Sequence, residues 1–137
     1  MPNSQPMVVY AATYDSTSAA LADLGAIDQL HKDQVIGSVD AAVIDRENGK
    51  PHIHKRMDRP RIRVIPEALG GGTLPRKELT DAAGDLSANQ AGLIAVGEPT
   101  IEKAVDQALT KADKVVKRTV DATTDEISSE LQQALIS

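Results

Sequence analysis

The chain has no cysteine, no phenylalanine and no tryptophan, and it has two tyrosines among its 137 residues. Without cysteine it cannot form a disulfide, a thiolate metal site or a cysteine nucleophile. Its core must be built from Ala, Val, Ile and Leu, which bury less area than aromatic side chains, and burial stabilises by about 25 cal/mol per Å². These absences predict either a close approach of helices and sheet, or stability gained by self-association.

Long apolar runs are absent as well. No stretch approaches the roughly 20 apolar residues of a membrane-spanning helix, and the opening MPNSQPMVVY lacks the basic and apolar regions of a secretory signal. A net charge of -5 makes the chain as a whole a poor partner for nucleic-acid phosphates. We therefore expect a soluble, cytoplasmic protein with no transmembrane segment and no nucleic-acid partner.

Apolar patterning predicts an opening strand and helix. Residues 1–6 read as a disordered lead, and the nearly continuous apolar run from Met7 to Tyr14 is typical of a strand buried on both faces. Asp15 or Ser16 can then cap a helix, since apolar residues recur after them at three- and four-residue spacing. Gly25, inside that helix, is interpreted as a point of close packing on the sheet.

A β-hairpin follows in the sequence. Ser38–Asp45 reads as a strand, and Asn48-Gly49 tolerates the positive φ angles that a type I′ turn needs. The returning strand is expected over His52–Met57. Pro51 cannot donate a ladder hydrogen bond, which predicts that this strand lies at an edge of the sheet.

The second half repeats the strand–helix–strand order after an irregular insert over residues 59–90. Ala91–Glu98 is a third apolar strand, Pro99 suits the first turn of a helix, and residues 113–122 return as a strand. A capping box at Thr123-x-x-Glu126 starts a C-terminal helix. The pattern predicts one α+β domain over residues 1–137, a ferredoxin-like split βαβ sandwich with an extra β-hairpin strand and a C-terminal helix.

Two stretches carry a family resemblance. The first is VDAAVIDRENGKPHIHK, which resembles the hairpin of the DUF1269 family, a family of small bacterial proteins of unknown function. The second is GLIAVGEPTIEKAVDQALTKADKVVKRTV with the trailing TTDEISSELQQAL, which resembles the strand, helix and strand of the same family. Some proteins of that family carry stress-associated labels, so the resemblance implies a role in stress physiology. It supplies no catalytic residues. Where such proteins often have a long Gly- and Ala-rich segment, this chain has ALGGG and a polar continuation.

The stretch GKPHIHKRMDRPRIRV is the first candidate site, because it holds two of the three histidines and six of the fifteen Lys and Arg residues. His52 and His54 alternate in a strand and so share a face with Arg56, where they could chelate a divalent metal with help from His31, Asp40 or Asp45. The alternatives are a solvated edge strand, or an anion- or partner-binding patch. That patch would comprise Lys55, Arg56, Arg59, Arg61 and Arg63.

The second candidate site is a small-molecule pocket on the sheet face near Tyr10 and Tyr14, although these tyrosines are expected to pack or cap the core. GGGTLPRKEL lacks the spacing of a phosphate loop, so no cofactor is expected. No catalytic constellation stands out. The leading hypothesis is therefore a non-enzymatic domain that acts by self-association or by binding a protein partner. A cofactor-free enzyme, an anion- or small-molecule-binding protein and a metal-binding protein are the alternatives.

Overall fold

The computed structural model describes residues 5–34, 39–47, 50–57, 91–122 and 127, which form an α+β fold, as predicted. Its described elements are five strands, two α-helices and one 3-10 turn. In chain order they are β1 (Gln5–Tyr14), α1 (Thr17–Lys32), β2 (Val39–Glu47), β3 (Lys50–Arg56), β4 (Ala91–Gly97), η1 (Pro99–Ile101), α3 (Glu102–Ala108) and β5 (Lys114–Ala122). The predicted insert at 59–90 and, apart from Ile127, the predicted C-terminal helix lie outside the described residues.

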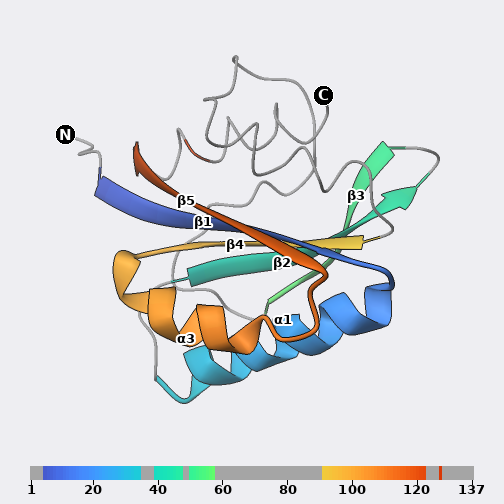
Figure 1. Ribbon diagram of the computed structural model, residues 1–137, viewed down its shortest axis with the longest axis horizontal. Helices are drawn as coiled ribbons and strands as arrows, with labels where there is room; N and C mark the ends of the chain where they lie inside the picture. Colours follow the sequence, from blue (N-terminus) through green and yellow to red (C-terminus); the bar gives the residue numbers. More distant parts are fainter. Residues whose placement is uncertain (1–4, 35–38, 48–49, 58–90, 123–126, 128–137) are drawn as a thin grey trace.

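The five strands form one antiparallel sheet in the order β3-β2-β4-β1-β5, and both helices lie on the same face of it (Figure 1). β1 is an inner strand, between β4 and the edge strand β5. Its apolar run is buried on both faces, because Val8 and Tyr10 pack against the helices while Val9 and Ala11, which point the other way, are also buried. The prediction of a fully buried strand is confirmed.

β1 begins earlier than the sequence predicted. Gln5 lies opposite Ala122 and Pro6 lies opposite Asp121, so the predicted disordered lead over residues 1–6 is wrong for its last two residues. The pairing with β4 starts only at Val8. Pro6, which has no N–H group, therefore has one strand neighbour, as a proline in a sheet usually does.

The predicted hairpin is confirmed by its register. Glu47 of β2 lies opposite Lys50 of β3, which leaves residues 48–49 as a two-residue connection, and these two lie outside the described residues. β3 forms an edge of the sheet, as Pro51 predicted. The strand ends at Arg56, and the backbone N–H of the next residue, Met57, donates to the carbonyl of Ala41 at 2.9 Å.

Helix α1 starts where the sequence placed its cap. The hydroxyl of Ser16 accepts a hydrogen bond from the backbone N–H of Ala19 at 3.2 Å. The interpretation of Gly25 as a sheet contact is wrong. Gly25 is exposed, and a Cβ atom built on it would meet nothing within 4 Å. The contacts of the described residues thus give no reason for a glycine at that position.

The core between helices and sheet is aliphatic except for two tyrosines. Leu24 and Ile27 of α1 and Val105 of α3 pack on alternate residues of the inner strands, with Tyr10 and Tyr14 among them. Pro99 opens η1, which continues directly into α3, so the helix begins at the predicted place with a tighter first turn.

Candidate functional site

Strand β3, which carries the first candidate site, has a bulge that breaks the simple alternation of its side chains. Ile53 lies opposite Ile44, but Lys55, two residues on, lies opposite Val43, so the register shifts by one residue between them. In a regular strand Ile53 and Lys55 would share a face. Because of the bulge they do not, and sequence spacing alone could not assign the faces of this strand.

The prediction that His54 and Arg56 share a face is wrong for this reason. His54 Nδ1 lies 2.9 Å from Oδ2 of Asp45, whereas Arg56 donates to Oδ2 of Asp40 at 3.0 Å. Asp40 and Asp45 are five residues apart on β2, so they point to opposite faces of the sheet. Their partners, Arg56 and His54, therefore also lie on opposite faces. Arg56 therefore does not extend to solvent beside the histidines.

The Arg56–Asp40 pair is a buried ion pair. The side chain of Asp40 is 0% exposed and that of Arg56 is 18% exposed. The His54–Asp45 pair is more open, with exposures of 40% and 21%. Burial of a charge is costly unless it is paired. We therefore assign Arg56 a structural role as the partner of Asp40. Within the described part of the predicted patch, Lys55 is the exposed cationic residue. Arg59, Arg61 and Arg63 lie outside the described residues.

The predicted metal site is not assembled within the described residues. These hold no group of three or more His, Asp and Glu side chains arranged to bind an ion. The two suggested carboxylates, Asp40 and Asp45, lie on opposite faces and are bound to Arg56 and His54, while His31 is buried in the last turn of α1. The side chain of His52 is outside the described part, although its backbone lies opposite Asp45.

Tyr14 binds the helix layer through a buried carboxylate. Its hydroxyl donates to Oδ2 of Asp23 at 2.8 Å, and the same oxygen accepts the backbone N–H of Lys111 at 3.1 Å. Burial, and then the hydrogen bond to Asp23, raise the pKa of Tyr14 above its ordinary value. Asp23 therefore links β1, α1 and the turn before β5.

Tyr10 makes a corresponding contact with α3. Its hydroxyl lies 2.9 Å from Oδ1 of Asp106 and 3.0 Å from the carbonyl oxygen of Glu102, two acceptors for one proton. Lys117 of β5 donates to carboxylate oxygens of Asp106 and Glu102, and its Nζ lies 6.0 Å from the centre of the Tyr10 ring. Burial and then the hydrogen bond to Asp106 raise the pKa of Tyr10, and the bonds to Glu102 and then Asp106 raise the pKa of Lys117.

These two networks explain why the core contains tyrosines. Tyr10 and Tyr14 are one helix-facing pair on β1, and each hydroxyl is bound to the carboxylate of a different helix. Both tyrosines are fully buried and pack within the core. Neither tyrosine lines the two cavities described below, so the predicted pocket beside them finds no support there.

The sequence reading missed Asp23 and Asp106, the acceptors of the two tyrosines. A signal for Asp23 was present, because it falls between Ala20, Leu24 and Ile27 on the buried stripe of α1. An acidic residue on an apolar helix face needs a polar partner in the core, and the chain has two core tyrosines. Asp106 gives no such signal, since it is exposed on the surface of α3.

Two exposed carboxylates lie together where β1 ends and β5 begins. A hydrogen bond between the side chains of Asp113 and Asp15 raises the pKa of Asp113, and the neighbouring negative charge acts in the same direction. The Asp113 backbone N–H donates to the carbonyl of Thr13 at 2.8 Å, which holds the two carboxylates close. At neutral pH they repel one another.

We predict that Asp113→Asn raises the midpoint of thermal unfolding at pH 7 by about 1–2 °C, the scale of exposed substitutions. Because the folded wild type binds this proton more tightly than the unfolded chain does, its stability rises as pH falls through the raised pKa. The advantage of the variant should therefore shrink at about pH 4. Glu98→Gln, at another exposed carboxylate, is the control. An advantage that grows in acid would contradict the repulsion.

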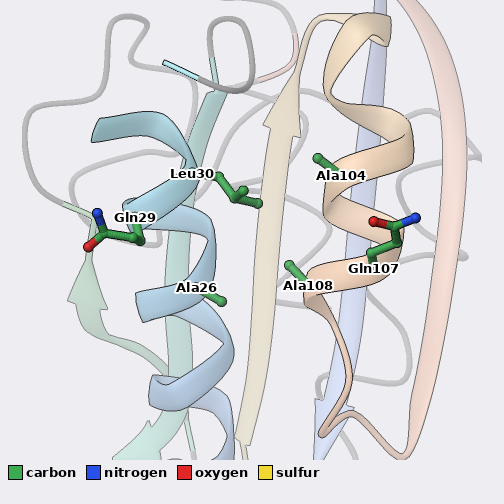
Figure 2. Close-up of a pocket in the computed structure, with 6 residues that line it drawn as sticks. All are labelled: Ala26, Gln29, Leu30, Ala104, Gln107 and Ala108. Carbon is green, nitrogen blue, oxygen red and sulfur yellow. The ribbon is translucent and has the colours of Figure 1, made fainter. Parts of the chain in front are cut away.

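Two open cavities lie in the helix layer that the described residues form. One, of about 440 Å³, lies between α1 and α3, where Leu30 and Ala26 face Ala104 and Ala108 across the gap and two glutamines stand at its sides (Figure 2). The other, of about 520 Å³, lies at the start of α3. It is lined by Pro99, Thr100, Glu102, Lys103, Asp106 and Gln107.

No family model, curated protein or solved structure matches the chain. None of the helices in the described residues is long and apolar enough to cross a bilayer.

Proposed function

We propose that the chain is a non-enzymatic domain that works by self-association, with a second copy docking on its helix layer. The fold is proposed to be ferredoxin-like: four strands in the order β5-β1-β4-β2, joined through α1 and α3, support it, with β3 as the added hairpin strand. A cytoplasmic location and a role in stress physiology belong to the same proposal and are supported by the sequence pattern and the DUF1269 resemblance.

The observation that carries the proposal is the uncharged groove between α1 and α3. Its lining is four apolar side chains and two amides, and it opens to solvent in a chain of which 26% of residues are charged. The four apolar side chains are only partly buried in the single chain, and a second helix laid in the groove would complete their burial. In contrast, the ionisable side chains of the two tyrosine networks are bound to one another and hold the fold together.

The outward face of α1 continues this uncharged surface. From Thr17 to Ile27 the helix has a single charged residue, Asp23, and that residue is buried. The residues of the helix that are exposed or partly exposed over its first three turns are neutral. They are Thr17, Ser18, Ala19, Leu21, Ala22, Gly25 and Ala26.

Gly25 adds an independent reason for a second chain at this face. A glycine inside a helix costs about 1 kcal/mol relative to alanine, and none of the described residues lies within 4 Å of where its Cβ atom would be. Close approach of another backbone is one of the uses of glycine. We therefore place the closest contact of the two copies at Gly25.

A second copy fits better than a charged partner because the surface is neutral. Two chains of net charge -5 repel one another overall, but they can meet on α1 without opposing like charges. If two α1 helices cross antiparallel at Gly25, Leu21 of one copy falls opposite Gln29 of the other, at the wall of the groove. The partner leucine can then enter the apolar space.

The test is Gly25→Lys. In the isolated chain lysine is a better helix former than glycine and meets no neighbour, so the monomer should gain roughly 0.5–1 kcal/mol. At a two-fold contact the same side chain brings bulk and a repeated positive charge to the closest point. We expect a stabilised monomer that no longer dimerises, measured by sedimentation velocity over a concentration series together with urea unfolding.

Thr119→Lys is the matched control, because it adds the same charge on the exposed strand β5 and not on α1. It should leave assembly unchanged. The proposal is wrong if the wild type is monomeric at micromolar concentration, or if Gly25→Lys assembles as the wild type does.

A further inference from the structure

Strand β5 forms the edge of the sheet opposite to β3, and the two edges differ in regularity. β5 pairs with β1 over nine consecutive positions, from Lys114 to Ala122, without a register shift. β3 carries a bulge and Pro51, and both features hinder the pairing of a further strand. The β5 edge is therefore the one that has the geometry to accept another strand.

The side chains of β5 are open to solvent along the first two thirds of the strand. Lys114, Val115, Lys117, Arg118 and Thr119 are exposed. Val115 is 41% exposed, and among the described residues it is the one large hydrophobic residue that is exposed. An open edge with an apolar side chain beside its backbone resembles the surfaces that bind extended peptides by strand addition.

The exposed part of β5 is positively charged, in contrast to the whole chain. It carries Lys114, Lys117 and Arg118 within five residues and no acidic residue between them, whereas the net charge of the chain is -5. Lys117 is partly neutralised by Glu102 and Asp106. Arg118 lies on the other face of the sheet, where its guanidinium donates to the backbone carbonyl of Lys117 at 2.9 Å.

The same charges restrict the pairing of β5 with a second copy of itself. In antiparallel pairing about a two-fold axis, each register is defined by the residue that lies opposite its own copy. Registers centred on Val116, Lys117 or Arg118 bring cationic residues directly opposite one another, which is destabilising. Registers centred on Val115 or Thr119 avoid this, because they place Lys117 opposite Asp113 or Asp121. An acidic strand meets the three cations without like-charge opposition in any register.

We infer that β5 binds an extended acidic segment of another protein as a sixth strand of the sheet. An Asp or Glu side chain of the segment would lie opposite Arg118, and alternate apolar side chains would cover Val115. This surface is distinct from the α1 face, so the inference does not rest on the self-association proposed above. Nucleic acid is the less favoured ligand, because stacking needs exposed aromatic rings and both tyrosines are buried.

The experiment is fluorescence anisotropy with a labelled short peptide of alternating Glu and Val. We expect saturable binding that weakens as salt is raised. Arg118→Glu should weaken it by about tenfold or more, since it reverses a charge at the edge. Lys55→Glu makes the same charge change on the exposed face of the bulged β3 strand and should have no effect. Circular dichroism and thermal unfolding check that both variants are folded.

Two further probes separate strand addition from charge attraction. The same peptide with alternate backbone nitrogens methylated keeps its charge but cannot form a ladder, so it should not bind. Labelled oligothymidylate should not bind either. Equal binding of the methylated peptide, equal loss in Lys55→Glu and Arg118→Glu, tighter binding of the oligonucleotide, or no binding of the Glu-Val peptide at all would overturn the inference.

Discussion

Arg56→Met is expected to destabilise the fold by about 3 kcal/mol, because it removes the guanidinium from a carboxylate that is 0% exposed. Methionine keeps much of the aliphatic volume, so the loss reports the charge and not the packing. Urea unfolding at pH 7 measures the change. His54→Gln removes the corresponding partner of Asp45 at a more exposed position of the same strand and should cost less than about 1 kcal/mol.

The double variant Arg56→Met with Asp40→Leu tests the cause. Replacing both members of a buried ion pair with apolar residues is often neutral or stabilising, whereas breaking the pair is not. We therefore expect the double variant to regain most of the stability lost by Arg56→Met, which gives a large coupling energy in the double-mutant cycle. If Arg56→Met costs less than about 0.5 kcal/mol, the pair does not stabilise the fold.

The same pair shows where sequence reasoning about the site reached its limit. The hairpin, its two-residue connection and the edge position of β3 followed from Asn48-Gly49 and Pro51, because turn chemistry acts on neighbouring residues. The bulge after Ile53 has no comparable local signal. One extra residue moved Arg56 away from the face of His54, and the predicted anion- or partner-binding patch included Arg56 as a solvent-facing residue.

The fold was more predictable than the site for a related physical reason. Apolar runs and caps such as Ser16 specify strands and helix starts within a few residues. The bond of Tyr10 to Asp106 joins residues 96 positions apart that meet only after the sheet has formed, whereas the bond of Tyr14 to Asp23 spans nine residues and depends on which side of α1 packs against β1. Whether Gly25 is exposed also depends on which side of α1 packs against the sheet.

The two tyrosines should make the protein sensitive to alkaline pH. Burial is the first cause that raises their pKa values, followed by the hydrogen bonds to Asp106 and Asp23. In the unfolded chain a tyrosine ionises at about pH 10. The folded state keeps its protons above that pH and the unfolded state loses them, so the stabilisation is fully present below about pH 10 and declines as pH rises further.

Each such tyrosine lowers the free energy of unfolding by about 1.4 kcal/mol per pH unit above its unfolded pKa, and the pair by about 2.7. Since these are the two tyrosines of the chain, ultraviolet absorbance of tyrosinate reports them without interference. We expect that absorbance to appear together with unfolding, monitored by circular dichroism, and not before it. The slope of stability against pH is measured by urea unfolding at successive pH values.

Tyr10→Phe and Tyr14→Phe should each remove about half of this slope, and the double variant should remove the tyrosine contribution. The single variants also lower stability at neutral pH, by about 1–3 kcal/mol for Tyr14 because its acceptor Asp23 is buried, and by less for Tyr10 because Asp106 is exposed. The slope is therefore the diagnostic quantity, since a loss of packing alone shifts stability equally at every pH. Tyrosinate absorbance that rises near pH 10 in the folded protein would show that the hydroxyls are not held by these carboxylates.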